Sequence, residues 1–250
     1  MGHGNSSPLE GLPVFSESVP EIQELVDHLG INQFFVLGWS RGGVHAMQIA
    51  TALHERVLGC AVVSSPGNLH HPSLSKKERK KIDAQGALIM TAPGCIGGLV
   101  RRMMKGIYYY PDKTKDFGFA GHSSGGFSYY KSKATGGAPK EMSSDHFYVT
   151  KLLDSELHGM NTVTGLSLEM QGLFHPWSYD IANIKCPCFL YVESKGEVPI
   201  THVQLNNRLI PGSELIVFQE HGHCSIMMEF EKIVLGLVKG NSVQSSYTTN

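Results

Sequence analysis

The chain has 250 residues, of which 41% are hydrophobic and 17% are charged, so it is long enough and apolar enough to bury a substantial core. Its formal net charge of −1 excludes the strongly basic balance that would favour nucleic acid or an anionic membrane surface as a partner. The sequence contains no apolar stretch of membrane-spanning length and no signal-peptide pattern, so we expect no membrane span.

The spacing of the cysteines and histidines indicates the redox compartment and whether a metal site is present. The five cysteines are an odd number and form no CxxC pair, which indicates buried thiols in a reducing compartment and favours a cytoplasmic protein. Neither His70-His71 nor His221-x-His223 has the partner residues of a metal site, so we expect no metal and no other cofactor. The basic cluster at 76–81 is most simply a solvated helix face, and we expect no nucleic-acid partner.

Apolar strands and helices alternate at both ends of the chain. Residues 16–30 predict a helix, with Ser18 and Glu21 as a capping box, and Gly30 suits its end. The further elements that we expect are strands at 33–37, 57–63, 186–192 and 214–218 and helices at 44–53, 201–210 and 226–238. Continuous apolar strands separated by helices predict an α/β fold whose mostly parallel sheet is covered on both faces.

The stretch 66–183 interrupts this alternation. It contains a glycine- and serine-rich segment and two expected helices, near 92–107 and 147–174. We therefore expect a core formed by 1–65 and 184–240, a helical cap inserted at 66–183, and a disordered polar tail at 241–250.

Two serines occupy a GxSxG pattern, and their surroundings differ. Ser40 follows an apolar strand and precedes a helix, whereas Ser123 lies among residues that predict a loop. A tight turn from strand to helix strains the backbone of its central residue and exposes the hydroxyl of that residue. The helix N-terminus and the backbone N–H of Arg41 could then stabilise an oxyanion, so Ser40 is the better candidate nucleophile.

These features resemble the α/β-hydrolase superfamily. Gly38 to Gly42 is similar to its nucleophile elbow. Residues 2–6 are similar to the G-x-G-x-S loop, which lies before the helix that precedes the nucleophile strand, and 176–187 are similar to the return from the cap to the next strand. His221-Gly222-His223 is similar to the Gly-His signature, and its position after the last strand implies that His223 is the catalytic base. The resemblance implies a partial α/β-hydrolase fold with a helical cap, acting on a small acyl substrate.

The position of the acid departs from the family pattern. The residue that matches the usual aspartate is Lys195, and a lysine cannot accept the imidazole N–H. Glu193 and Glu197 are the nearby carboxylates; Glu197 could turn toward His223, while Glu193 could instead end the strand. The alternative acid position after the second strand offers only Ser64, Ser65 and Asn68. We take Glu197 as the first candidate for the acid and leave Glu193, or no acid, as the alternatives.

The start of the chain is the second departure. About four strands precede the G-x-G-x-S loop in the family, whereas here Met1 stands directly before Gly2, which suggests a truncated product, an isoform or a fragment. We therefore expect strand 33–37 at an exposed sheet edge, through which the chain could form oligomers. Residues 1–6 also match an N-myristoylation pattern, although the resemblance explains the same glycines.

Two functions remain open from the sequence. The first is a serine hydrolase in which Ser40 attacks an ester, thioester or amide, His223 moves the proton and Glu197 orients His223. The second is a binding protein with little or no activity, which Lys195 and the missing N-terminal strands favour. The substrate cannot be deduced, because specificity would depend on the cap.

Overall fold

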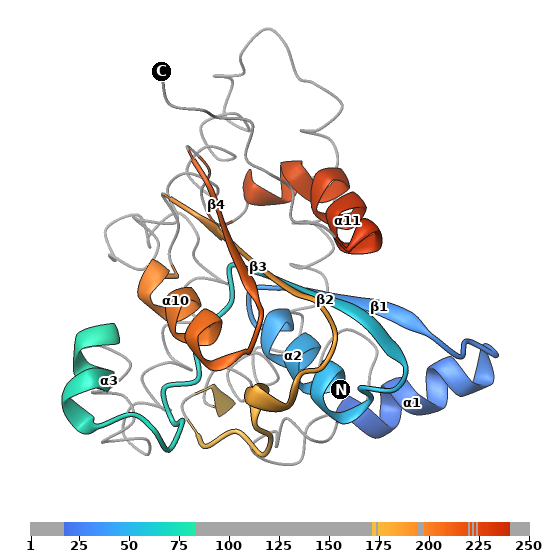
Figure 1. Cartoon of the computed structure of the whole chain (residues 1–250), viewed down its shortest axis with the longest axis horizontal. Helices are drawn as coiled ribbons and strands as arrows, with labels where there is room; N and C mark the ends of the chain where they lie inside the picture. Colours follow the sequence, from blue (N-terminus) through green and yellow to red (C-terminus); the bar gives the residue numbers. More distant parts are fainter. Residues whose placement is uncertain are drawn as a thin grey trace, which may run out of the picture.

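Four strands form one parallel sheet in the computed structural model, which describes residues 18–83, 172–173, 175–194, 198–219, 221, 223 and 225–240 (Figure 1). The strands are β1 (Phe34–Trp39), β2 (Val57–Val63), β3 (Cys188–Glu193) and β4 (Glu214–Phe218). They are adjacent in the order β1-β2-β3-β4, and each neighbouring pair is parallel. The expected parallel α/β architecture is confirmed.

Helices cover both faces of this sheet. The α-helices of the described ranges are α1 (Ser18–His28), α2 (Gly42–Ala52), α3 (Lys76–Ile82), α10 (Ile200–Leu209) and α11 (Phe230–Lys239), and two 3₁₀ turns are η4 (Ile181–Asn183) and η5 (Ser225–Glu229). Figure 1 shows α1, α2 and α10 on one face and α11 on the other. Alternate residues of β2 and β3 accordingly enter two separate cores, since Val62 and Leu190 pack with α2 and α10 while Val63 and Tyr191 pack with α11.

Among the described elements, the strands at 57–63 and 214–218 have the expected bounds and the others differ by a few residues at one or both ends. The strand expected at 186–192 is observed as Cys188–Glu193, so it includes Glu193. Strand β1 continues two residues beyond the expected end, because Gly38 and Trp39 still pair with Val62 and Val63 of β2. The expected last helix begins instead as the 3₁₀ turn η5 and becomes α-helical only at Phe230, a common arrangement at helix N-termini.

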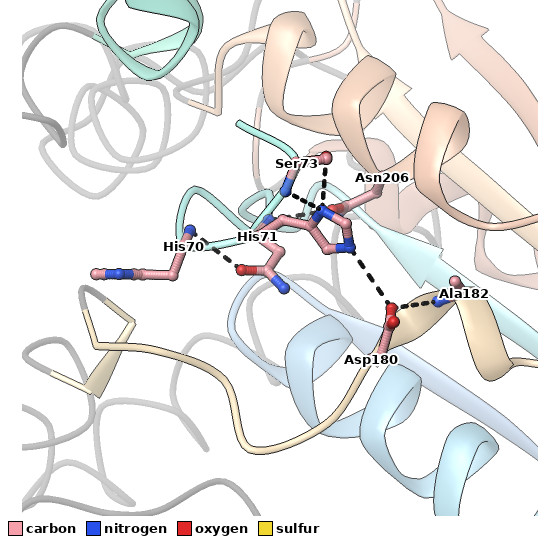
Figure 2. A network of polar contacts seen from close by, with 7 residues as sticks. His70, His71, Ser73, Asp180, Ala182 and Asn206 are labelled. Atoms are coloured by element: carbon pink, nitrogen blue, oxygen red, sulfur yellow. Dashed lines mark hydrogen bonds and ion pairs between the residues drawn. The ribbon is translucent and has the colours of Figure 1, made fainter. Parts of the chain in front are cut away.

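A network of polar contacts joins the loop after β2 to α10 and η4 (Figure 2). The backbone N–H of Asn68 donates to Asn206 Oδ1 at 3.2 Å, and His71 Nε2 lies 3.6 Å from Asp180 Oδ1. Asp180 also caps η4, because the same oxygen accepts the backbone N–H of Ala182 at 2.9 Å. These contacts fix the loop that follows β2 beside the carboxyl end of the sheet.

Several sequence predictions fall on residues outside the described ranges. These are the loop at 2–6, Ser123, the helices near 92–107 and 147–174, the tail at 241–250, and Lys195 and Glu197. The division into core and cap therefore stays a prediction. Within the ranges that are described, β1 lies at the edge of the sheet and no helix is long and apolar enough to cross a membrane.

Candidate active site

Ser40 occupies a sharp turn between β1 and α2. Its φ of 56° is in the left-handed region, and its backbone N–H donates to the carbonyl of Val63 at 2.7 Å. Left-handed backbone is costly for a residue with a side chain, so this turn is strained where the hydroxyl is presented. The strand–turn–helix context that the sequence predicted for Ser40 is therefore present.

The glycines around Ser40 have unequal steric roles. A Cβ on Gly38 would lie 2.1 Å from the carbonyl oxygen of Gly42, so position 38 tolerates no side chain. At Gly42, in contrast, no described atom lies within 4 Å of the added Cβ. The crowded glycine after the serine is Gly43, whose Cβ would lie 2.5 Å from that of Ser65. Of the two glycines that flank Ser40, the described surroundings therefore require a glycine at position 38 and place no such restriction on position 42.

His223 lies within hydrogen-bond distance of Ser40. Its Nε2 is 3.0 Å from Ser40 Oγ, although 183 positions separate the two residues in the chain. The pairing follows from the topology, because the residues that follow β1 and β4 both lie at the carboxyl end of the parallel sheet. A neutral imidazole in this position can accept the hydroxyl proton of the serine.

Glu193 lies behind His223 on the side away from Ser40. Its Oε1 is 3.3 Å from His223 Nδ1, and its side chain has no exposed surface, compared with 14% for the histidine side chain. The other carboxylate oxygen, Oε2, accepts a short hydrogen bond from the hydroxyl of Ser64, the residue after β2. Glu193 therefore ends β3, as the sequence allowed, and also contacts His223.

The sequence contained a signal for Glu193 that was not used, because Glu193 directly follows the apolar segment 186–192. Glu193 ends the strand CFLYVE, all of whose residues are buried. A carboxylate that is shielded from water requires hydrogen-bonding or charged partners, so a glutamate at the end of a fully buried strand is a candidate for contact with a histidine. The strand pattern alone could not identify that partner, because it comes from a distant loop.

Trp39 contacts His223 in two ways. Its indole Nε1 donates a 3.0 Å hydrogen bond to the backbone carbonyl of His223, and the two ring centroids are 5.2 Å apart. These contacts join the loop after β4 to the end of β1.

The remaining candidates lie as follows. Arg41 is at the N-cap of α2, where the first backbone N–H groups of a helix lack partners within the helix. His221 turns to a different group, Glu229, with 3.4 Å between its Nε2 and Glu229 Oε1. No cluster of three or more potential metal ligands occurs among the residues with described positions.

In the site, the hydroxyl of Ser40 contacts the imidazole of His223, which in turn contacts the buried carboxylate of Glu193. Such a series of contacts allows the imidazole to take the proton of the hydroxyl and the carboxylate to stabilise the resulting cation. The N-terminus of α2 behind Ser40 adds a partial positive charge close to where an oxyanion would form. The arrangement suits nucleophilic attack on a carbonyl carbon.

Comparison with known proteins agrees with this geometry at the level of the fold. The sequence profile of the family described as "alpha/beta hydrolase fold" matches residues 1–86. None of the curated proteins is similar enough in sequence to count as a match.

Solved structures extend the similarity over most of the chain. A hydrolase from Pseudomonas aeruginosa PA01 has a TM-score of 0.61 at 17% identity, with 95% of this chain and 76% of that chain covered. MGS-M2, an alpha/beta hydrolase enzyme from a Medee basin deep-sea metagenome library, has a TM-score of 0.59 at 18% identity, with 99% and 78% covered. A thermophilic esterase from Thermogutta terrifontis has a TM-score of 0.56 at 18% identity, with 96% and 78% covered.

The chain therefore has the α/β-hydrolase fold. The resemblance that the sequence predicted is confirmed at that level.

Proposed function

We propose that the protein is a serine hydrolase that cleaves a small acyl substrate by covalent catalysis. One observation supports this most strongly: Ser40, at φ 56° in a strand-to-helix turn, has its Oγ 3.0 Å from His223 Nε2. A strained turn that presents a hydroxyl to an imidazole is costly for stability and suits a nucleophile. The similarity to structures named as hydrolases and esterases supports the same class.

The reaction would proceed in two halves. His223 Nε2 takes the hydroxyl proton as Ser40 Oγ attacks the carbonyl carbon, and the backbone N–H of Arg41 stabilises the oxyanion. His223 then gives the proton to the leaving alcohol, thiol or amine, which leaves an acyl group on Ser40. Water, deprotonated by His223, attacks this acyl group and releases the acid.

The acid of the proposed triad is Glu193. The 3.3 Å contact between its Oε1 and His223 Nδ1 would hold the proton of the neutral imidazole on Nδ1 and leave Nε2 free to accept. This choice takes the alternative that the sequence left open. The candidacy of Glu197 stays a prediction that only a variant can test.

An ester is the substrate class to test first. Several structurally similar proteins are named as esterases, and esters need less activation of the leaving group than amides. The chain should hydrolyse a short p-nitrophenyl ester, and Ser40→Ala should abolish this activity. Ser123→Ala, in the second GxSxG pattern, is the matched control and should leave the rate unchanged.

A fluorophosphonate probe gives an independent answer. It should attach to Ser40 in the wild-type chain, and the His223→Gln variant should be labelled much more slowly. If the adduct maps to Ser123 with Ser40 unmodified, the assignment of the nucleophile is wrong. If neither serine is labelled and no ester is cleaved, the alternative of an α/β-hydrolase-fold binding protein, which Lys195 favours, gains support.

A further inference from the structure

Ser64 shares an unusual backbone conformation with Ser40. Its φ is 50°, and these two serines are the non-glycine residues with positive φ within the described ranges. Ser64 directly follows β2, is fully buried, and its backbone N–H donates to the carbonyl of Tyr191 at 2.8 Å. A strained residue that is held in place by its surroundings suggests a function for its side chain.

The hydroxyl of Ser64 is directed at the proposed acid. Its Oγ donates a short hydrogen bond to Glu193 Oε2, while the other oxygen of the same carboxylate faces His223. The end torsion of a glutamate is broad, so one contact to an imidazole would leave the carboxylate plane poorly fixed. A second contact on Oε2 determines this plane and therefore the direction in which Oε1 points.

The topology explains why the two side chains meet. Strands β2 and β3 are parallel neighbours, with Val63 opposite Tyr191, so Ser64, which follows β2, and Glu193, the last residue of β3, both lie at the carboxyl end of the sheet. The left-handed turn at Ser64 then ends β2 where its short side chain faces Glu193. A serine is the smallest residue that offers a proton donor from this position.

We infer that Ser64 is a positioning residue for the proposed triad and extends it to a chain of four side chains, from Ser40 through His223 and Glu193 to Ser64. This inference rests on the proposed function. Ser64 acts through Glu193, because it orients the carboxylate that holds the His223 tautomer. It also supplies a hydrogen-bond donor to a charge that has no exposed surface.

The neighbouring serine provides a matched control. Ser65 is also buried, at 1% exposure, but its hydroxyl has no hydrogen-bond partner in the described part of the chain. Ser64→Ala and Ser65→Ala therefore remove the same group from adjacent buried positions, and only the first removes a contact with Glu193. Ser64→Gly removes the hydroxyl and also relieves the positive φ, which separates the hydroxyl from the backbone.

The first measurement is steady-state hydrolysis of a p-nitrophenyl ester, with kcat expressed per fluorophosphonate-reactive site. Ser64→Ala and Ser64→Gly should both lower kcat by about tenfold to 100-fold with KM unchanged, the range known for groups that orient a metal-bound side chain through a hydrogen bond. Ser65→Ala should leave both constants unchanged. A purely structural role would instead reduce the number of reactive sites and leave kcat per site as in the wild type.

The second measurement does not depend on activity. The ¹⁵N shifts of the His223 imidazole, observed through its carbon-bound protons and assigned with His223→Gln, report which ring nitrogen is protonated. Ser64→Ala should change these shifts toward a mixture of tautomers, and Ser65→Ala should not. If Ser64→Ala leaves them unchanged, the inference is overturned.

The two measurements separate failure of the inference from failure of the proposed function. A wild-type chain that cleaves no ester, but whose ¹⁵N shifts respond to Ser64→Ala, would contradict the hydrolase and retain the positioning role. A chain with Ser40-dependent activity in which Ser64→Ala changes neither kcat nor the shifts would contradict the positioning role of Ser64 and retain the hydrolase.

Discussion

The indole of Trp39 and the backbone of His223 are joined by a 3.0 Å hydrogen bond from Nε1 to the carbonyl oxygen, and their rings are 5.2 Å apart. Trp39 is the last residue of β1 and directly precedes Ser40. The residue before the proposed nucleophile therefore holds the loop that provides the proposed base. This hydrogen bond fixes the relative positions of two segments that are distant in the chain.

Loss of this hydrogen bond should slow the reaction. Trp39→Phe keeps an aromatic ring beside the imidazole but cannot donate, so kcat for a p-nitrophenyl ester should fall by up to about tenfold, the equivalent of one ordinary hydrogen bond. Trp39→Ala removes the ring as well and should lower kcat further. The other tryptophan, Trp177, stacks on Tyr179, and Trp177→Phe should leave kcat per active site unchanged. Equal losses in Trp39→Phe and Trp177→Phe would argue against a specific role.

Stability should depend on Gly43 and not on Gly42. Gly43→Ala places a Cβ 2.5 Å from that of Ser65 and should lower the free energy of unfolding by about 1–3 kcal/mol, as overpacked cores do. Gly42→Ala meets no described atom within 4 Å at the start of α2 and should be neutral or up to about 1 kcal/mol stabilising. Urea unfolding of both variants measures this difference. Adding Ser65→Gly to Gly43→Ala should recover part of the loss, and no recovery would contradict the proposed clash.

Two cysteines, Cys60 and Cys186, should be slow to react in the folded chain. Burial raises the pKa of the Cys186 thiol to about 11, and a hydrogen bond with Cys188, together with burial, raises the pKa of Cys60 well above its ordinary value. Because the thiolate is the reactive form, these thiols are protonated and unreactive at neutral pH, and alkylation becomes possible only as the pH rises toward the raised pKa. Iodoacetamide labelling followed by peptide mass spectrometry at pH 7 should modify them only after denaturation. Rapid labelling of Cys60 in the native chain would contradict its burial.

The expectation that the chain forms oligomers through β1 stays a prediction, which a charge on this strand can test. Phe35 on this strand is 37% exposed, and β1 pairs only with β2 among the described strands. An apolar strand edge favours association, and a charge on it opposes association. Phe35→Lys should therefore shift the chain toward the monomer in light scattering. Leu235→Lys, at an exposed site on α11, is the control and should not. A wild-type chain that is already monodisperse as a monomer would remove the expectation.

The sequence predicted those features that depend on local pattern. The strands Val57–Val63 and Glu214–Phe218 have the bounds that were expected, because each is a continuous apolar segment between turn residues. The strand-to-helix turn at Ser40 was predicted for the same reason. Contacts such as that of Ser64 with Glu193 were not predicted, since they depend on how the carboxyl ends of two neighbouring strands are aligned.

The assignment of the acid shows the same limit. The spacing before Pro199 placed the acid at Lys195, so Glu197 was taken as a carboxylate of the same loop, whereas the apolar segment directly before Glu193 favoured Glu193. Only the position of Glu193 relative to His223, which the register of β3 and β4 determines, distinguishes a carboxylate that ends a strand from one that also contacts the imidazole.

Variants of Glu193, Glu197 and Lys195 should identify the acid. Glu193→Gln retains the shape but not the charge, and a comparable change in a serine protease, an example from another protein, lowers kcat about 10⁴-fold because the imidazole adopts the wrong tautomer. We expect a loss of about 100-fold up to that limit here, with KM little changed. Glu197→Gln, the matched control in the same segment, should retain most activity.

Lys195→Asp completes the test. With Glu193 already in contact with His223, a new carboxylate at 195 should change kcat little in the wild-type background. In the Glu193→Gln background, the same substitution would raise activity only if residue 195 can reach the imidazole, so it measures whether the usual family position remains usable. A large loss in Glu197→Gln together with full activity in Glu193→Gln would show that the contact between Glu193 and His223 is structural and that Glu197 is the acid.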